Sequence, residues 1–423
     1  MDKLKFPRGF LWGAATSAHQ VEGGNRNDWT AWEKQNAEKL AKSIAKKSPE
    51  FLRTLPALKE QAGDPQNYIS GTACDHYNRF LEDFELARSL HQNVHRFSVE
   101  WSRIEPQEGV FDEEAIRHYQ EVVKALKTKG LEPFVTLWHF TLPGWLSEKG
   151  GWNGQRSVMY FNRYVEKVVT ALSPQVRFWI TINEPQVYAA LSYLKGVWPP
   201  QKKDPRAYWR VIQNLIHGHK LAYTSIKQIN PSAQVGIAKH NIYFEADKNK
   251  PINQLLKRIA DWWLNYYVLD EIKNHQDFIG LNYYFHNRIS WWFGRNENKQ
   301  VSDLGWELYP AGIYHVLAGL KKYNRPIYVT ENGLADATDT RRGWYIEEVL
   351  RNIHKALVEK VDVRGYMHWS LLDNFEWAYG FWPRFGLVEV DFKTQKRTVR
   401  DSAYKYAEIC KSNAVSAAAE RQS

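Results

Sequence analysis

Two similar stretches decide the fold, Trp179-Ile180-Thr181-Ile182-Asn183-Glu184-Pro185 and Ile327-Tyr328-Val329-Thr330-Glu331-Asn332-Gly333. Each is a run of β-branched and aromatic residues, which is typical of a strand buried on both faces. Each run ends at a glutamate that is followed by residues that break a strand. Parallel α/β barrels carry their catalytic groups at the carboxyl ends of such strands. We therefore expect Glu184 and Glu331 to face each other across one pocket.

A facing pair of carboxyl groups is typical of glycoside hydrolysis. One carboxyl group protonates the leaving oxygen, and the other attacks the sugar or activates water. Either glutamate alone could instead be a helix-capping residue near a turn. Because the same pattern occurs twice, the sequence favours a catalytic pair.

Strand-like and helix-like patterns alternate along nearly the whole chain. The predicted strands are residues 10–16, 94–101, 131–138, a fourth ending at 184, 234–240, 278–284, 326–330 and 363–371. Eight strands separated by helical patterns predict an α/β fold, a single (β/α)8 TIM barrel with a closed parallel sheet. An open doubly wound sheet is the alternative, but no Gly-rich phosphate loop follows the first strand.

The same alternation of strands and helices indicates the domain organisation. We expect one barrel domain over residues 1–411, because no linker or repeat divides the chain. Residues 33–67 are charged and helical in pattern, so we expect a helical insertion near the N-terminus, packed on the outside of the barrel. Residues 412–423 are mostly small and polar, and we expect a disordered C-terminal tail.

Composition limits the partners. The 423 residues carry a formal charge of +10, but the lysines are scattered, so we expect a solvated basic surface and no nucleic acid partner. The two cysteines lie far apart and form neither a disulfide framework nor a zinc site. No apolar run approaches a membrane span, so we expect a cytoplasmic protein without a membrane partner. The 19 Trp and 23 Tyr suit sugar binding, since sugars stack on such rings, although many must be core residues.

Further polar and aromatic residues fall at the ends of the predicted strands. Any one of them could be an ordinary buried polar group or cap. Their shared position at one end of a barrel favours a common site. They are Gln20 after the first strand, Arg96 in the second, His139 after the third, Asn183 in the fourth, Asn282 and Tyr284 in the sixth, Trp369 in the eighth, and Glu376 and Trp377 beyond it.

With these residues in place, the chain resembles family 1 glycoside hydrolases, the β-glucosidase and β-galactosidase family. The resemblance runs from Phe6 to about Tyr406 and rests on several motifs in order. The matching motifs are FPxGFLWGAATSAHQVEG at 6–23, FSVEWSRIEP at 97–106, TINEP at 181–185, GLNYY at 280–284, VTENG at 329–333, and HWSLLDNFEWAYGF with RFGLVEVDF within 368–392.

The resemblance implies a retaining double displacement with Glu331 as nucleophile and Glu184 as general acid/base, their carboxyl groups about 5–5.5 Å apart. Arg96 and the Tyr284 hydroxyl are expected to keep Glu331 ionised, while repulsion from Glu331 raises the pKa of Glu184. Asn183 is expected to bind the sugar 2-hydroxyl, with Asn282 in support. The resemblance assigns Gln20, His139, Glu376 and Trp377 to other ring hydroxyls, Trp369 to a stacking floor and Phe385 to an aromatic rim.

The chain departs from the family at three places. Phe140 and Gln186 stand where the family often has tryptophans, which leaves the aglycone preference open. Residues 241–277 are shorter than usual, which predicts a shortened region after the fifth strand. A thin barrel wall there could leave the site open and admit an unexpected hydrophobic ligand.

The sequence thus favours a retaining exo-β-glycosidase for neutral β-glucosides or β-galactosides, without metal or cofactor. A 6-phospho-β-glycosidase is the first alternative; an anionic Glu376 would repel a phosphate dianion. A non-catalytic sugar-binding or hydrophobic-ligand-binding barrel is the second, although a binder has no need of two tuned carboxyl groups. The oligomeric state is left open.

Overall fold

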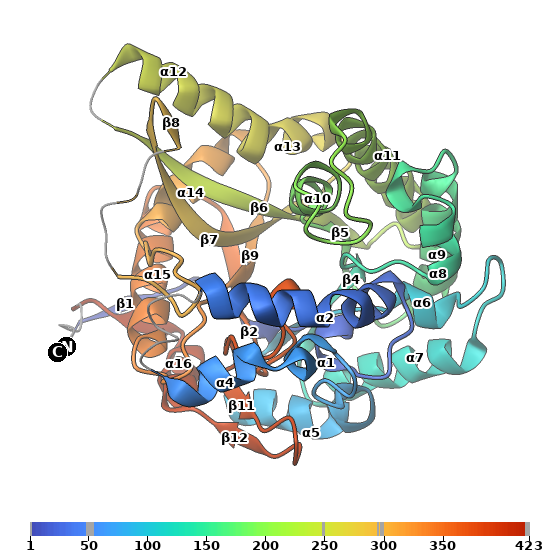
Figure 1. Ribbon diagram of the computed structural model, residues 1–423. Coiled ribbons are helices and arrows are strands. Elements are labelled where there is room, and N and C mark those ends of the chain that lie inside the picture. The colour runs from blue at the N-terminus through green and yellow to red at the C-terminus, as the bar shows by residue number, and fades with distance from the viewer. Residues whose placement is uncertain (1, 48–54, 248–249, 294–295, 297–299, 419–423) are drawn as a thin grey trace.

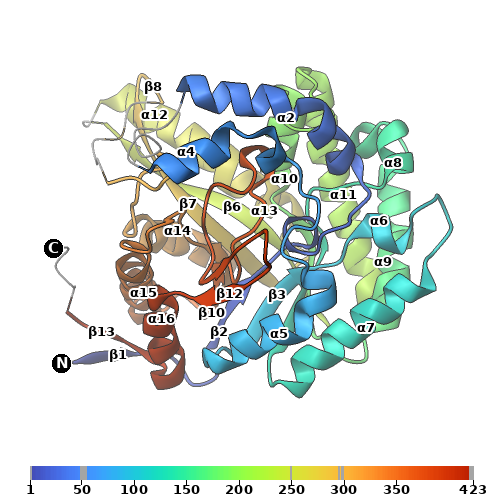
Figure 2. The same cartoon turned by 60° about the horizontal axis from the view of Figure 1, so that its bottom comes forward.

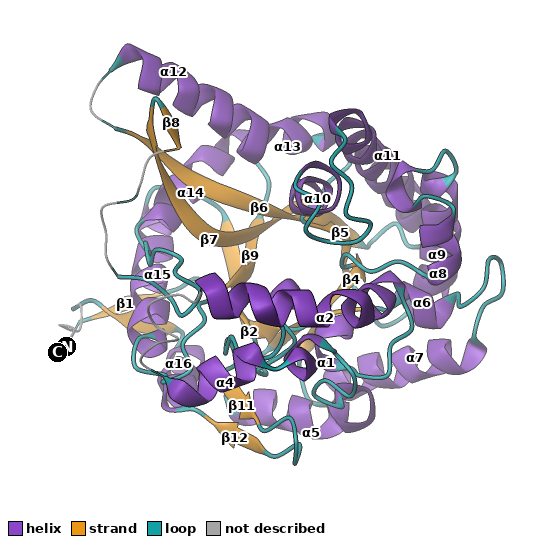
Figure 3. Ribbon diagram, in the orientation of Figure 1, coloured by secondary structure: helices purple, strands orange, loops and turns teal. Residues whose placement is uncertain are grey.

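A computed structural model describes residues 2–47, 55–247, 250–293, 296 and 300–418. Eight parallel strands form a closed ring, and helices lie around it (Figures 1 and 3). The ring closes through pairing of β6 with β7, the two ends of the strand order. The predicted TIM barrel is therefore confirmed.

The strands of the barrel follow one another in chain order. They are β2 (Leu11–Ala15), β3 (Val94–Ser98), β4 (Glu132–Trp138), β5 (Phe178–Asn183), β6 (Gln234–Ala246), β7 (Phe278–Ser290), β9 (Ile327–Asn332) and β10 (Val363–Trp369). β6 and β7 each run well past the predicted strand end and remain paired up to Ala246 and Ile289. The short β8 (Trp292–Phe293) turns back antiparallel on the end of β7.

Helices connect the strands. The longer ones outside the barrel are α5 (His76–Ser89), α7 (Glu113–Thr128), α9 (Ser157–Leu172), α11 (Pro205–Ile229), α14 (Gly312–Leu320), α15 (Arg342–Val358) and α16 (Asp401–Ser412). Short elements lie in the loops: α1 (Ala18–Val21), α6 (Trp101–Ile104), α8 (Gly144–Glu148), η2 (Gly151–Asn153), α10 (Pro185–Ala189), η3 (Ala190–Leu194), η5 (Lys321–Tyr323), η6 (Trp377–Tyr379) and the sheet of β11 (Val388–Val390) with β12 (Arg397–Val399). Among the described residues, no helix is long and apolar enough to span a bilayer.

Local sequence explains why these helices form where they do. α7 begins after Asp112, whose side chain accepts hydrogen bonds from the backbone N–H groups of Glu114 and Ala115. Its apolar residues recur at helical spacing and are buried against the sheet, while its charged residues face outward.

The lower interior of the barrel is filled with apolar side chains. Every strand contributes to this layer, which consists of Leu11, Val94, Phe134, Phe178, Ile180, Ala238, Phe278, Tyr328 and Met367. The rings of Phe134 and Phe178 stack with centroids 4.3 Å apart. The barrel is thus a packed core rather than a pore, so a site must lie at one of its ends, and TIM barrels use the carboxyl end for catalysis.

The predicted insertion does not pack only on the outside. α2 (Asp28–Lys47), α4 (Pro56–Gly63) and η1 (Pro65–Tyr68) lie across one end of the barrel (Figures 1 and 2). Trp29 and Trp32, in the first turns of α2, are buried, and the ring of Trp29 lies 4.7 Å from that of Trp377. The charged pattern hid this contact because the buried tryptophans precede most of the charged run. Residues 48–54 of the predicted insertion lie outside the described residues.

The region after the fifth strand is short but leaves no gap in the ladder. β6 continues to Ala246, and α12 (Pro251–Ala260), the π-helical η4 (Asp261–Tyr266) and α13 (Tyr267–Ile272) return the chain to β7. Residues 248 and 249 lie outside the described residues. The expected thin wall is therefore absent along the paired length of β6 and β7.

The predicted disordered tail is wrong for residues 412–418. β13 (Ala414–Ser416) pairs antiparallel with β1 (Lys3–Lys5). Asn413 ends α16 in a left-handed conformation, and its side chain accepts a hydrogen bond from Trp12 Nε1 and donates one to the carbonyl of Phe6. The small residues of this segment fit against an edge strand, which composition alone does not reveal. Residues 419–423 lie outside the described residues.

Candidate active site

Glu331 stands near the carboxyl end of β9 and is buried. One carboxylate oxygen lies 2.5 Å from Nη1 of Arg96, which comes from β3. The other oxygen accepts a hydrogen bond of 3.0 Å from the Tyr284 hydroxyl on β7. An arginine and a phenol thus hold this carboxyl group, both of which favour its ionised form.

Glu184 follows β5 directly and is also buried. It has a left-handed backbone conformation, with φ of 43°, because the chain turns sharply there into α10 with Pro185 in its first turn. Its carboxylate accepts a hydrogen bond of 2.8 Å from the amide of Asn282 on β7. A neutral amide therefore holds Glu184, whereas a cation holds Glu331.

Hydrogen bonds connect the two carboxyl groups. The side-chain oxygen Oδ1 of Asn183 accepts from Nη2 of Arg96 at 2.7 Å and from the side-chain amide of Asn282 at 3.2 Å. The Asn282 oxygen in turn accepts from the Thr330 hydroxyl at 2.7 Å. The predicted residues Arg96, Asn183, Asn282 and Tyr284 thus form one network between Glu184 and Glu331.

The two glutamates differ in electrostatics. Burial, followed by repulsion from Glu331, raises the pKa of Glu184 to about 8. Burial also leaves the pKa of Glu331 above its ordinary value, although the charge and hydrogen bond of Arg96 and the hydrogen bond from Tyr284 offset part of this rise. Repulsion from Glu331 was the expected cause of the raised pKa of Glu184, and burial contributes more. Of the two groups, Glu184 is therefore the one that retains its proton.

Gln20 and Glu376 meet on the other side of the site. The Gln20 amide donates to the Asn374 side chain and the Phe375 carbonyl, each at 2.9 Å, and to Glu376 at 3.3 Å. Burial, then the charges of Glu331 and Glu184, raise the pKa of Glu376 to about 8. Glu376 is therefore largely protonated near neutral pH, and the sequence-based argument from its own negative charge is weakened.

The predicted aromatic residues surround His139. Its ring lies parallel to those of Trp369 and Trp377, 6.0 Å from each. His139 Nε2 is 3.3 Å from the Asn183 amide, and burial, then Arg96, hold its pKa well below the usual range. The imidazole is therefore neutral. Phe385 is buried in one apolar cluster with Trp369.

Trp306 was not predicted but joins this wall. Its ring is 6.1 Å from both Tyr284 and Phe385. It lies in an irregular loop before α14 and belongs to none of the motifs, so the sequence held no signal for it.

Other aromatic rings surround Phe140, the first departure from the family. Its ring centre lies 5.2 Å from that of Trp377, and the ring centre of Trp198 lies 5.0 Å from that of Phe140 and 5.7 Å from that of Trp377. Together with Trp29, these rings pack around Trp377 and fix its position.

Gln186, the second departure from the family, contacts η4. The Gln186 amide donates to the Trp263 carbonyl at 2.5 Å. The neighbouring Leu264 carbonyl accepts from Nζ of Lys239, also at 2.5 Å, and Lys239 is buried. Burial lowers the pKa of Lys239 to about 7, while the charge of Glu184 raises it. A π-helical turn often marks a functional position, and this one holds a cation that acts on Glu184.

Sequence reasoning missed Lys239, although a signal was present. Lys239 directly follows the apolar run Val235-Gly236-Ile237-Ala238. A lysine in a buried strand is rare unless its charge is paired. The backbone carbonyl of Ala238, the residue before Lys239, accepts a hydrogen bond of 2.8 Å from the backbone N–H of Glu184. The backbone of Lys239 therefore lies close to Glu184.

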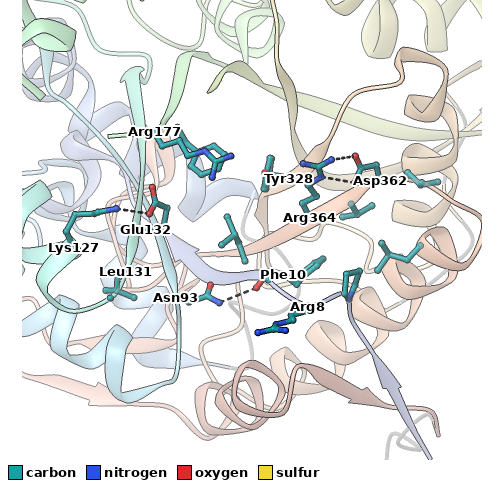
Figure 4. A pocket seen from close by; sticks show the side chains of 18 residues that line it. Arg8, Phe10, Asn93, Lys127, Leu131, Glu132, Arg177, Tyr328, Asp362 and Arg364 are labelled. Atoms are coloured by element: carbon teal, nitrogen blue, oxygen red, sulfur yellow. Dashed lines mark hydrogen bonds and ion pairs between the residues drawn. The ribbon is translucent and has the colours of Figure 1, made fainter. Parts of the chain in front are cut away.

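A separate pocket lies at the opposite, amino end of the strands (Figure 4). Arg8, Arg177 and Tyr328 line it, together with the ion pairs Lys127–Glu132 at 2.9 Å and Arg364–Asp362 at 2.8 Å. TIM barrels use this end for stability rather than catalysis. Over the described part of the chain, no cluster of His, Cys, Asp or Glu forms a metal site.

Two buried carboxyl groups at the carboxyl end of a TIM barrel, one beside an arginine and one beside an amide, are an arrangement expected of a glycoside hydrolase. The family model described as "Glycosyl hydrolase family 1" matches this chain in two overlapping segments, residues 2–270 and 240–415. The chain belongs to this family and is a glycoside hydrolase, which confirms the resemblance seen in the sequence.

Similar proteins include β-glucosidases and a β-glycosidase. β-Glucosidase A of Thermotoga maritima is 32% identical over 98% of this chain and 99% of its own length. The β-glycosidase structure from Pyrococcus horikoshii superposes with a TM-score of 0.87 and 37% identity, covering 98% of this chain and 97% of that one. A T. maritima β-glucosidase in complex with glucoimidazole superposes with a TM-score of 0.85 at 32% identity, over 97% of this chain and 99% of that one.

Proposed function

We propose that the protein is a retaining exo-β-glycosidase for neutral β-glucosides and β-galactosides, with Glu331 as nucleophile and Glu184 as general acid/base. The unequal surroundings of the two glutamates carry this proposal. Arg96 and Tyr284 favour an ionised Glu331, while burial and Glu331 raise the pKa of Glu184 to about 8.

In the first step, Glu331 attacks the anomeric carbon while Glu184 gives its proton to the departing aglycone oxygen. The glycosyl–enzyme ester carries no charge at residue 331, so the pKa of Glu184 falls once repulsion is lost. In the second step, Glu184 removes a proton from water, which attacks the anomeric carbon and releases Glu331. No step requires a metal or cofactor.

The sugar contacts follow from unused hydrogen-bonding capacity. Nδ1 of His139 is buried and has no hydrogen-bond partner within the described part of the chain. With Gln20 and Glu376, it offers donors and acceptors for ring hydroxyls, while Trp369 and Trp377 offer flat apolar faces. Relatives named β-glucosidase and β-galactosidase support a substrate range that includes both sugars.

A phosphorylated sugar is disfavoured by the surrounding charge rather than by Glu376 alone. The charge that acts most strongly on Glu376 is that of Glu331, the carboxyl group expected to be ionised. A phosphate dianion beside this group of carboxyl groups would lose its hydration without gaining a cation.

The test is release of nitrophenol from nitrophenyl β-glycosides, neutral and 6-phosphorylated, by wild type, Glu331→Gln and Glu184→Ala. We expect Glu331→Gln to lose several orders of magnitude on every substrate. Glu184→Ala should retain part of the first step, because nitrophenolate needs little protonation to leave. Equal loss in both variants on this leaving group would contradict the roles, and faster turnover of phosphorylated substrates would contradict the substrate class.

A further inference from the structure

The helix α12 carries its apolar stripe on the outside of the molecule. Ile252, Leu255 and Ile259 follow each other at spacings of three and four residues, and Trp262 continues the row in η4. All four side chains are 39–53% exposed. A helix of a globular protein normally turns such a stripe toward the core, so this face lacks the usual covering.

Two further exposed tryptophans extend the stripe at its ends. The backbone N–H of Trp291 donates to the Asn253 side chain at 2.9 Å, which places Trp291 beside the start of α12. At the other end, Trp209 of α11 stacks on Trp263 with centroids 5.8 Å apart. Trp209, Trp262 and Trp291 are the exposed tryptophans among side chains that the structure describes, and each lies in or beside α12 and η4.

Cations flank this apolar face. Nζ of Lys250 lies 5.8 Å from the centre of the Trp291 ring, and Lys257 pairs with Asp261 at 2.7 Å. Arg258 is exposed, and within the described part of the chain no carboxylate lies within ion-pair distance of it. α12 contains Lys257 and Arg258 and no acidic residue, with Lys250 directly before it and Asp261 directly after it, so the segment has a positive balance.

We propose that this face, formed by α12, Trp209, Trp262 and Trp291, docks on an anionic lipid surface. Trp and aliphatic residues on one side with Lys and Arg beside them are the composition of a helix that lies in the membrane interface. Aromatic rings occupy the headgroup level, and the cations attract anionic lipids. The sequence analysis expected no membrane partner because no run can span a bilayer, but a helix that lies on the surface needs no such run.

Docking through α12 would bring the active site close to the lipid surface. α12 follows the carboxyl end of β6, so it lies on the rim at the end of the barrel that holds Glu184 and Glu331 (Figure 1). A glycoside with an apolar aglycone partitions into lipid. A protein seated on this face would therefore meet that substrate at the edge of its own site.

The test is sedimentation with sucrose-loaded vesicles of phosphatidylcholine alone or with one-third phosphatidylserine. We expect binding to the mixed vesicles that weakens as salt rises. Leu255→Glu with Ile259→Glu should remove binding, and Lys250→Gln with Arg258→Gln should weaken it by about fivefold per charge, the equivalent of about 1 kcal/mol each. Hydrolysis of a water-soluble nitrophenyl glycoside should stay unchanged, since these residues lie outside the site.

Met159→Glu on α9 is the matched control, because it adds a charge to an exposed apolar position away from α12. It should bind vesicles as wild type does. Absence of vesicle binding at low salt, or equal binding to both lipid mixtures, would overturn the proposal. So would a concentration-dependent dimer that Leu255→Glu with Ile259→Glu dissociates, because the face would then belong to a second copy of the chain.

Discussion

Tyr284→Phe offers a sharp test of how Glu331 is kept ionised. The substitution keeps the ring, which packs near Trp306, and removes only the hydroxyl that donates to Glu331 at 3.0 Å. A hydrogen bond to a charged group contributes about 1.5–3 kcal/mol. At about 1.4 kcal/mol per tenfold change, its loss favours the protonated form of Glu331 by about 10- to 150-fold.

The sign of the effect follows from the ionised form being the active one. Loss of the donor raises the pKa of Glu331, so the acid limb of the kcat/KM profile moves to higher pH. Activity should fall by about 10- to 150-fold on the acid side and approach that of wild type where Glu331 is ionised in both proteins. The assay is nitrophenyl glycoside hydrolysis across pH.

Tyr283→Phe is the matched control. Its hydroxyl donates to the Tyr309 carbonyl at 2.8 Å and has no role at Glu331. Its loss should cost about 0.5–1.5 kcal/mol of unfolding free energy and leave the pH profile in place. If Tyr284→Phe gave a profile that superimposes on wild type, the hydroxyl would not tune Glu331 and the reasoning would be refuted.

Three further substitutions test the remaining electrostatics. In wild type, kcat/KM should fall as pH rises through about 8, where Glu184 loses its proton, and Glu184→Gln should abolish this alkaline limb in a pH–rate series. With a pKa of about 7, Lys239 is only partly charged where Glu184 titrates, and its charge is the smallest of the effects that lower the pKa of Glu184. Lys239→Met should therefore move the same limb to higher pH by a small amount, and an unmoved limb would separate Lys239 from the acid/base. Asp373→Asn breaks the buried pair with Arg400 at 2.8 Å and 2.9 Å and should cost about 3–5 kcal/mol in urea unfolding. Although burial raises the pKa of Asp373, Arg400 brings it below the usual value. This contribution to stability is therefore present above the unfolded pKa and lost as pH falls through the folded one, and a wild type equally stable in acid would contradict it.

Much of the fold was predictable because parallel strands buried on both faces leave apolar runs in the sequence. Glu184 and Glu331 were found for the same reason, since an abrupt polar residue ends each run. The extra length of β6 and β7 was not predictable. Beyond His240 the two strands pair outside the barrel, and their mixed burial resembles a loop.

The errors arose where tertiary contacts override local composition. Residues 414–416 are small and weakly apolar, yet they form an edge strand because residues 3–5 lie beside them. Trp29 was assigned to no element, yet it packs against Trp377, more than 300 residues away along the chain. Lys239 was overlooked because its carbonyl partners come from η4, which no motif marks.

The π-helical turn η4 joins two parts of the molecule that are otherwise separate. Trp262 is half-exposed at the surface, while the next two carbonyls, of Trp263 and Leu264, hold Gln186 and Lys239 beside Glu184. One turn of backbone thus has an exposed side chain on its outer side and hydrogen bonds to buried residues near Glu184 on its inner side. A substitution within η4 itself, such as at Trp262, should therefore shift the pH dependence of turnover, whereas Leu255 and Ile259 lie in α12 before this turn.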